Sequence, residues 1–294
     1  MSEVLLFNLI AAAIFSTLLF VILNYFHRWK IQNLQGLTVN YLTASAFAFF
    51  SNYEQNCKAL SGIQVTGPPA LGIGLLFILV FYTTALTTQK AGIAAASIAS
   101  KMSMVLPITA GIYLYNDHLT SLRVIGIILA IVALYLSSKS TNSESELNKS
   151  KRAWIFPLLL FFGCGIIDTS IKISQQYIMN PENEQLYYSL LFGCAGLFGL
   201  IAMLYNRIKN KKIFELRSLF AGVLLGIVNY YSLLFLVRCL AEPGAESALI
   251  FALVNMLVVI LSAITAFLVF KQKLTKENLS SIALALLAIF ILSR

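Results

Sequence analysis

Charged residues are scarce in this sequence, at 11% of 294 residues, and acidic residues are scarcer than basic ones, with 12 Asp and Glu against 21 Lys and Arg. Hydrophobic residues make up 59% of the chain and the mean hydropathy is +0.83. These values are too apolar for an ordinary soluble domain, so the composition predicts a polytopic protein whose surroundings are the lipid bilayer. The net charge of +9 then reports membrane topology, and we predict no nucleic-acid partner.

Motifs of catalysis, metal binding and ATP use are also missing from the sequence. The four cysteines (Cys57, Cys164, Cys194 and Cys239) form no CxxC pair, and there is no HExxH motif and no paired His and Cys ligand set. The phosphate-binding pattern GxxxxGK[ST] does not occur either. We therefore predict no catalytic residues, no metal site and no cofactor, and neither an enzyme nor an ATP-driven pump.

Long apolar runs, each about the length that crosses a bilayer, fill the chain. Polar or charged breaks, among them Gln89, Lys90 and Gly92, separate them, and Pro68-Pro69 is predicted to open the third. The fold class is therefore an all-α integral membrane protein with ten predicted transmembrane helices at 4–26, 36–51, 68–89, 91–115, 121–138, 153–177, 185–206, 215–239, 243–270 and 276–293.

Lys and Arg alternate between successive loops, which predicts the direction of each helix. One set of loops and helix ends holds fifteen of the 21 basic residues, the other holds four, and Lys101 and Lys172 lie within helices. Because cytoplasmic loops carry the basic excess, we predict a multi-pass protein of the cytoplasmic membrane with both termini outside.

The polar segment 140–152 divides the chain into two five-helix halves, residues 1–139 and 153–294, and we predict that it is cytoplasmic. The halves look related, because GIYLYNDHLT at 111–120 and AFLVFKQKLT at 266–275 each lead into an apolar helix, at a constant offset of 155 residues. A repeat with an odd number of crossings must place its copy upside down in the membrane. The predicted architecture is therefore two inverted five-helix repeats, which is typical of secondary transporters.

The chain resembles the EamA-type transporters of the drug/metabolite transporter superfamily over essentially its whole length. The resemblance lies in the ten-helix arrangement, the two halves, the small-residue-rich fourth helix with Ser97, Ser103 and Pro107, and the acid-x-Leu-Thr junction from Asp117 to Thr120. In the second half Gln272 replaces the junction acid, so that position is not a shared carboxylate. The resemblance implies export or exchange of amino acids, metabolites or drugs.

Lys101 is the main candidate site residue, because it lies near the middle of the predicted fourth helix, where a charge costs about 2.5 to 3.5 kcal/mol. It shares one helical face with Ala94, Ser97, Met104 and Ile108. Its amine can bind a carboxylate or phosphate of the substrate, or release a proton and couple transport to protons. The alternative is a structural ion pair between helices.

Asp168 and Lys172 in the sixth predicted helix are candidates for coupling or gating. Their spacing of four residues allows them to neutralise each other, and Lys172 can instead extend outward to water. Asp168 can also pair with Lys101, in which case substrate or a proton would compete for that bridge.

The remaining candidates are two asparagines near mid-depth, Asn229 and Asn255, uncharged residues that can line the polar wall of the cavity, and charges at the outer membrane surface. Asn255 falls within two residues of the repeat counterpart of Lys101, and the alternative role for the asparagines is hydrogen bonding between helices. Arg238 and Glu246 form a candidate outer gate or an ordinary solvated loop. The substrate-binding candidates beside Lys101 and Ser97 are Asn255, Asn229, Asn40, Tyr41 and Tyr82.

These observations predict a secondary transporter that moves a small polar metabolite, amino-acid-like or anionic, by alternating access, with protons as a candidate coupling ion. A drug or cationic-compound exporter and a carrier of lipid-linked or nucleotide sugars are the alternatives among transporters. A membrane scaffold or enzyme without transport activity is the alternative from another class.

Overall fold

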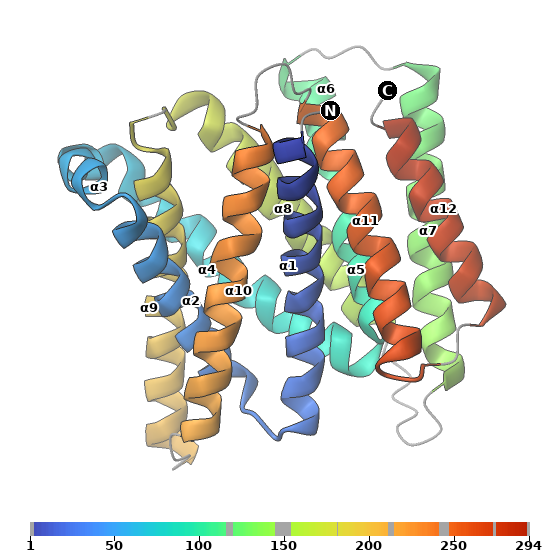
Figure 1. Cartoon of the computed structure of the whole chain (residues 1–294), viewed down its shortest axis with the longest axis horizontal. Coiled ribbons are helices and arrows are strands. Elements are labelled where there is room, and N and C mark those ends of the chain that lie inside the picture. Colours follow the sequence, from blue (N-terminus) through green and yellow to red (C-terminus); the bar gives the residue numbers. More distant parts are fainter. Residues whose placement is uncertain are drawn as a thin grey trace. The chain divides into compact units, whose positions relative to one another are not determined.

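The computed structural model describes residues 3–115, 120–144, 154–180, 182–210, 215–240, 247–272 and 275–292, and within these ranges the chain is helical with no strand (Figure 1). The elements are α1 (Glu3–Arg28), α2 (Asn33–Ser51), α3 (Tyr53–Ala59), the 3-10 helix η1 (Leu60–Gly62), α4 (Ile63–Lys90), α5 (Ile93–Met102), α6 (Val105–Tyr115), α7 (Ser121–Glu144), α8 (Ile155–Tyr177), α9 (Glu184–Asn210), α10 (Leu216–Leu240), α11 (Ser247–Leu268) and α12 (Lys276–Leu292).

Seven segments are long and apolar enough to cross a membrane, which makes the chain a multi-pass membrane protein. They are Glu3–Arg28, Tyr53–Lys90, Ile93–Ala110, Ile155–Tyr177, Glu184–Lys209, Leu216–Cys239 and Ile250–Leu268, with Val124–Ser137 as a shorter apolar helix. The all-α fold class is thus confirmed for the described residues.

Each of the ten predicted ranges is helical over most of its described residues, but two boundaries were predicted wrongly. The third helix does not open at Pro68-Pro69; α4 begins at Ile63 and contains both prolines. Gly67 precedes the pair and lacks the Cβ that would clash with the Pro68 ring, so the helix continues through it. The predicted fourth helix, 91–115, is two helices, α5 and α6.

The break between the third and fourth predicted helices is confirmed. α4 ends at Lys90 and α5 begins at Ile93, and Gly92 between them has φ of +91°. That left-handed conformation favours glycine because it carries no Cβ.

The chain forms two compact units, and each takes residues from both halves of the sequence. Unit 1 comprises Met1–Asn24, Thr83–Ile166 and Tyr231–Arg294, and unit 2 comprises Tyr25–Tyr82 and Ile167–Tyr230. Four helices contribute to both units: α1, α4, α8 and α10.

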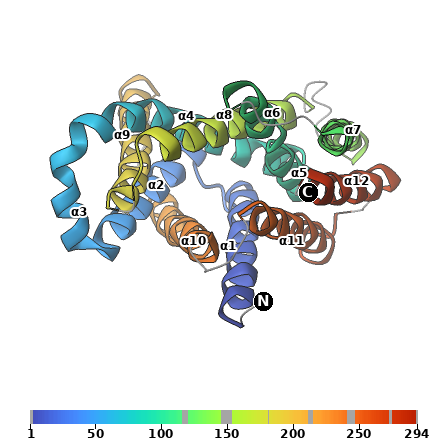
Figure 2. The same ribbon diagram turned by 90° about the horizontal axis from the view of Figure 1, so that it is seen from above.

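In unit 1, helices from the two sequence halves pack in pairs. α7 packs along α12, and the two lie side by side in both views (Figures 1 and 2). α5 packs against α11, and it also contacts α7 and α12. Near the end of α1, the side chains of Asn24 and Gln89 donate hydrogen bonds to the carbonyl oxygens of Thr88 and Leu23, which join α1 to α4.

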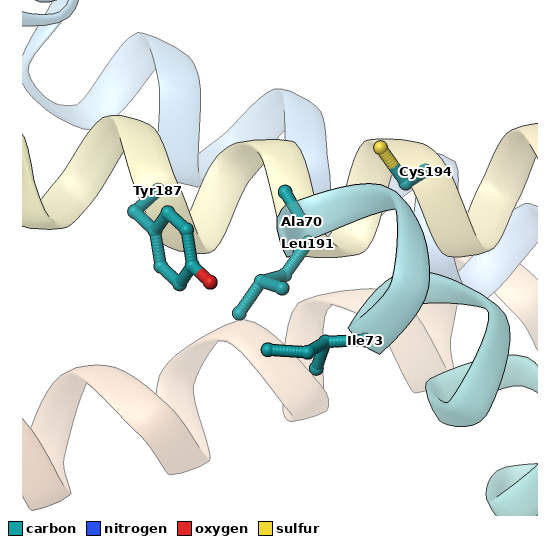
Figure 3. Packing of buried hydrophobic residues seen from close by; sticks show 5 residues of the cluster. All are labelled: Ala70, Ile73, Tyr187, Leu191 and Cys194. Atoms are coloured by element: carbon teal, nitrogen blue, oxygen red, sulfur yellow. The ribbon is translucent and has the colours of Figure 1, made fainter. Parts of the chain in front are cut away.

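In unit 2, α2 is the central helix. It packs along α9 and, through two glycines, against α10. α4 covers another face of α9, where Ala70 and Ile73 of α4 meet Tyr187, Leu191 and Cys194 of α9 (Figure 3). The Tyr187 hydroxyl lies 2.8 Å from the hydroxyl of Ser174 on α8, so the phenol group buried in this apolar cluster has a hydrogen-bond partner.

Candidate functional site

The fourth membrane segment is interrupted at Ser103 and Met104, between α5 and α6. Pro107 explains the interruption, since it has no N–H to donate to the carbonyl of Ser103 and its ring would clash with that carbonyl in a continuous helix. The Ser103 carbonyl instead accepts from the N–H of Leu106 at 2.9 Å, one residue early. The backbone is thus tightened at this point to an i→i+3 hydrogen bond, and the chain then resumes an α-helix.

Lys101 lies in the last turn of α5, directly before this interruption, and its side chain is half-buried. A cation in the last turn of a helix is stabilised by the partial negative charge of the terminal carbonyls. Ser97, one turn earlier, is completely buried, and its hydroxyl donates to the carbonyl of Ala94 at 2.9 Å. The interruption therefore places the lysine at the end of a half-helix and leaves Ser97 bonded within its own helix.

Two other helices of unit 1 pack on this segment. The thiol of Cys164 on α8 lies 3.5 Å from the Ser100 hydroxyl, and Gly165 packs on the side chain of Leu106 so closely that a Cβ would not fit. α11, which packs against α5, carries the half-buried Asn255. The predicted candidates Lys101, Ser97 and Asn255 thus lie on two helices that contact each other.

Unit 2 brings together Asn40 and Asn229, which come from α2 and α10. The Nδ2 of Asn229 donates to the Oδ1 of Asn40 at 3.3 Å, and the two side chains are 6% and 0% exposed. Asn40 Nδ2 is buried and has no hydrogen-bond partner among the described residues. A buried donor left unsatisfied costs about 1–3 kcal/mol, so the unpaired Asn40 Nδ2 lowers the stability of the folded protein.

The close approach of α2 and α10 depends on glycine. A Cβ on Gly226 would lie 2.6 Å from the carbonyl oxygen of Asn40, and one on Gly222 would lie 2.6 Å from that of Gly36. Since both obstacles are backbone atoms, a side chain at either position would push the helices apart. Gly222 and Gly226 therefore allow α2 and α10 to pack closely.

Tyr41 is fully buried in unit 2, and its hydroxyl donates to the carbonyl of Phe77 at 2.9 Å. Its ring packs with Phe77, Phe81 and Phe192 at centroid distances of 5.4 to 6.1 Å. Tyr82 on α4 is 40% exposed. Of the two predicted tyrosines, Tyr41 is enclosed by aromatic side chains and Tyr82 lies at the surface.

Two polar contacts of unit 2 were not predicted from the sequence. Ser45 on α2 and Ser189 on α9 each donate to the other's carbonyl, at 2.9 and 3.1 Å. At the start of α2 and α10, Gln32 Nε2 donates to the Glu215 carboxylate at 2.8 Å, the Glu215 N–H donates to Gln35 Oε1 at 3.1 Å, and Gln35 Nε2 donates to Gln32 Oε1 at 3.0 Å. For the contact between Ser45 and Ser189, the only sequence signal was that both helices carry small residues. The contact at the start of α2 and α10 had no sequence signal.

The charged candidates other than Lys101 lie at exposed positions or outside the described residues. Asp168 and Lys172 are exposed on α8 in unit 2. Arg238 is exposed at the end of α10 in unit 1, with its guanidinium 5.8 Å from the ring centroid of Phe235. Glu246 lies outside the described residues, so its predicted gating role has no structural counterpart here.

Comparisons with known proteins complete this description. No protein-family profile matches the sequence. The chain is similar to an uncharacterized protein of Haemophilus influenzae (strain ATCC 51907 / DSM 11121 / KW20 / Rd), with 28% identity over 291 residues that cover 97% of each chain. A solved structure described only as the crystal structure of a protein superposes with a TM-score of 0.56 over 95% of this chain and 97% of its own, at 11% identity. That likeness concerns the fold alone.

Proposed function

We propose that the protein is a secondary transporter that moves a small polar metabolite, amino-acid-like or anionic, across the cytoplasmic membrane by alternating access. The observation that carries the proposal is the interrupted fourth segment with half-buried Lys101 at the end of its first half-helix. Interrupted helices within the membrane are characteristic of substrate and ion sites in secondary transporters. A lysine there supplies a compact positive charge for a carboxylate or phosphate.

The helix pairs inside each unit support the proposed inverted repeats. If the two five-helix halves are copies, α2 corresponds to α9, the α5–α6 segment to α11, and α7 to α12. Each of these corresponding helices packs against its counterpart. The four helices that contribute to both units also form corresponding pairs, α1 with α8 and α4 with α10. Packing of α2, α5 and α7 on their own counterparts is what a two-fold axis between the halves would produce, and it favours ten crossings of the membrane.

Transport in liposomes that contain the purified protein tests the proposal. The panel comprises labelled amino acids, organic acids, nucleotide sugars and cationic dyes. We expect uptake of a zwitterionic or anionic compound, and we expect Lys101→Met to lower that uptake by roughly 10- to 150-fold, since a hydrogen bond to a charged group is worth about 1.5–3 kcal/mol.

The control variant is Lys209→Met, which removes an exposed lysine near the end of α9. Its uptake should match that of the wild type. Equal uptake by Lys101→Met would remove Lys101 from the site. Uptake of cationic dyes alone would contradict the proposed substrate class and would favour a drug exporter.

A further inference from the structure

We propose that the buried amide pair of Asn40 and Asn229 is a second substrate-contact site, in which Asn40 Nδ2 donates a hydrogen bond to a carbonyl or carboxylate oxygen of the substrate. The inference rests on the proposed transport function, and it adds a requirement on the substrate. The molecule must present a hydrogen-bond acceptor to an uncharged donor.

In the arrangement of the pair, Asn40 Nδ2 is the atom left over. Asn229 Nδ2 lies 3.3 Å from Asn40 Oδ1 and donates to it. Turning only the Asn40 amide over would bring two NH₂ groups to that distance, and turning both amides over would exchange donor and acceptor. With both amides as the structure places them, the remaining atom of Asn40 is a donor, and a ligand atom that satisfies it must be an acceptor.

Three neighbouring polar side chains of α2 are bonded to the protein. Thr38 donates to the carbonyl of Leu34 at 2.7 Å, Tyr41 to that of Phe77, and Ser45 to that of Ser189. Across α2, all of whose residues are described, Asn40 Nδ2 is the one buried side-chain polar atom without a partner. The protein bonds these three groups and leaves the Asn40 donor, which can therefore donate to a transient partner.

The surrounding helices restrict the chemistry of that partner. α2 has no charged residue, and neither has α10 from Ser218 to Val237. Recognition here therefore uses a neutral hydrogen bond, which accepts a carbonyl as readily as a carboxylate oxygen. A compound whose only polar group is an amine or quaternary ammonium offers no acceptor, and it would leave Asn40 Nδ2 unsatisfied.

Cysteine accessibility tests whether water and solutes reach the pair. In a variant whose four native cysteines are replaced by serine, single cysteines are placed at Asn40, Lys101 and Ser45 and treated with a small neutral methanethiosulfonate during turnover. Asn40→Cys should react at a rate comparable to Lys101→Cys. Ser45→Cys, at the contact of α2 with α9, should react far more slowly, because that contact is structural.

The outcomes separate the two proposals. If Asn40→Cys reacts no faster than Ser45→Cys, the amide pair is a helix contact only and this inference is overturned, whatever Lys101→Cys does. If Lys101→Cys is also unreactive, the proposed aqueous pathway and with it the transport function are contradicted. Reaction at Asn40→Cys alone supports the amide site and excludes Lys101 from the substrate pathway.

Transport by amide variants tests the hydrogen bond itself. For the compound taken up by the wild type, Asn40→Leu should lower uptake about tenfold, the loss expected for one hydrogen bond. Asn40→Gln keeps an amide donor and should recover most of that loss. Wild-type uptake by Asn40→Leu would overturn the inference, and so would equal loss in both variants, since Asn40→Gln then fails for reasons of packing rather than donation.

Discussion

Asn56 is a second fully buried asparagine of unit 2, and its bonding contrasts with that of Asn40. Asn56 Nδ2 donates to the carbonyls of Ala48 and Phe49, at 3.2 and 2.7 Å, which are among the last carbonyls of α2. The Ala48 carbonyl also accepts from the Ser51 hydroxyl at 2.9 Å, and Asn56 adds to this capping of α2 at its C-terminal end. Its amide donor is consumed by the fold, whereas that of Asn40 is not.

Asn56→Ala should therefore lower stability and leave transport unchanged. The loss of two buried hydrogen bonds predicts a decrease in the free energy of unfolding of about 1–3 kcal/mol, measured as a lower melting temperature in detergent. Ser61→Ala is the control, because that hydroxyl makes one exposed bond to the carbonyl of Lys58. Its effect should stay within about 0.5 kcal/mol. Equal melting temperatures for both variants would contradict the capping role of Asn56.

The sequence located polar residues at mid-depth, but it did not give their partners. Asn229 was predicted near mid-depth and Asn40 on the second helix as a cavity-lining residue, because hydrophobic runs are local features. They are 189 residues apart, and which side chain meets which depends on tertiary packing. The same limit applies to Tyr41, whose hydroxyl turned out to bond a carbonyl of α4. The bonding of a polar side chain to its own helix, as in Ser97, is equally invisible to a hydropathy pattern.

At the scale of elements, the distances from each glycine to neighbouring atoms show which glycines are needed for helix packing. A Cβ on Gly226 meets the backbone of α2, whereas a Cβ on Gly72 of α4 meets nothing within 4 Å. Both glycines lie within helices. They therefore form a matched pair in which one substitution is blocked by packing and the other is not.

Gly226→Ala should destabilise the protein by about 1–3 kcal/mol, because α2 cannot yield at a carbonyl oxygen without moving as a whole. Gly72→Ala should stabilise it by about 0.5–1 kcal/mol, since alanine is the better helix former. Thermal melting of the two purified variants measures both effects. The same sign for both changes would show that the α2–α10 contact is looser than described.

The interruption of the fourth segment is the element that sequence analysis misjudged. A continuous helix was predicted across Pro107, because the apolar run continues to Tyr115. In the structure, the tight turn at Ser103 satisfies the carbonyl of Ser103 within the segment itself, through the N–H of Leu106. A pattern of apolar residues cannot distinguish a kinked helix from two half-helices.

Pro107→Ala restores an N–H that can donate to the carbonyl of Ser103, and it should favour a continuous helix. Proline in a helix interior costs about 3 kcal/mol, so the variant should be at least as stable as the wild type by thermal melting. If the half-helix end at Lys101 forms the site, uptake should nevertheless fall at least about tenfold. Full transport with raised stability would show that the interruption is dispensable.

At the scale of the whole molecule, the alternation of basic residues predicts which loops meet the cytoplasm. The ten predicted crossings would place residues 140–152 inside the cell and both termini outside. A cysteine at Ser145, in the cysteine-free background, should react with an impermeant maleimide in inverted vesicles and not in intact cells, while a tag at either terminus should be reached from outside. The opposite pattern would reverse the orientation, and labelling of the two termini from opposite sides would exclude an even number of crossings.

The position of α2 has a consequence for biosynthesis. Its bonding partners are made late: Ser189 follows Ser45 by 144 residues, and Asn229 follows Asn40 by 189. At about 5–20 residues per second, the ribosome needs on the order of 10 s or more to deliver them. During that interval the amide and hydroxyl groups of α2 lack the α9 and α10 partners that bury them in the folded protein. The first five helices made alone should therefore be a substrate for membrane quality-control proteases, and release of the whole chain should be the step that protects α2.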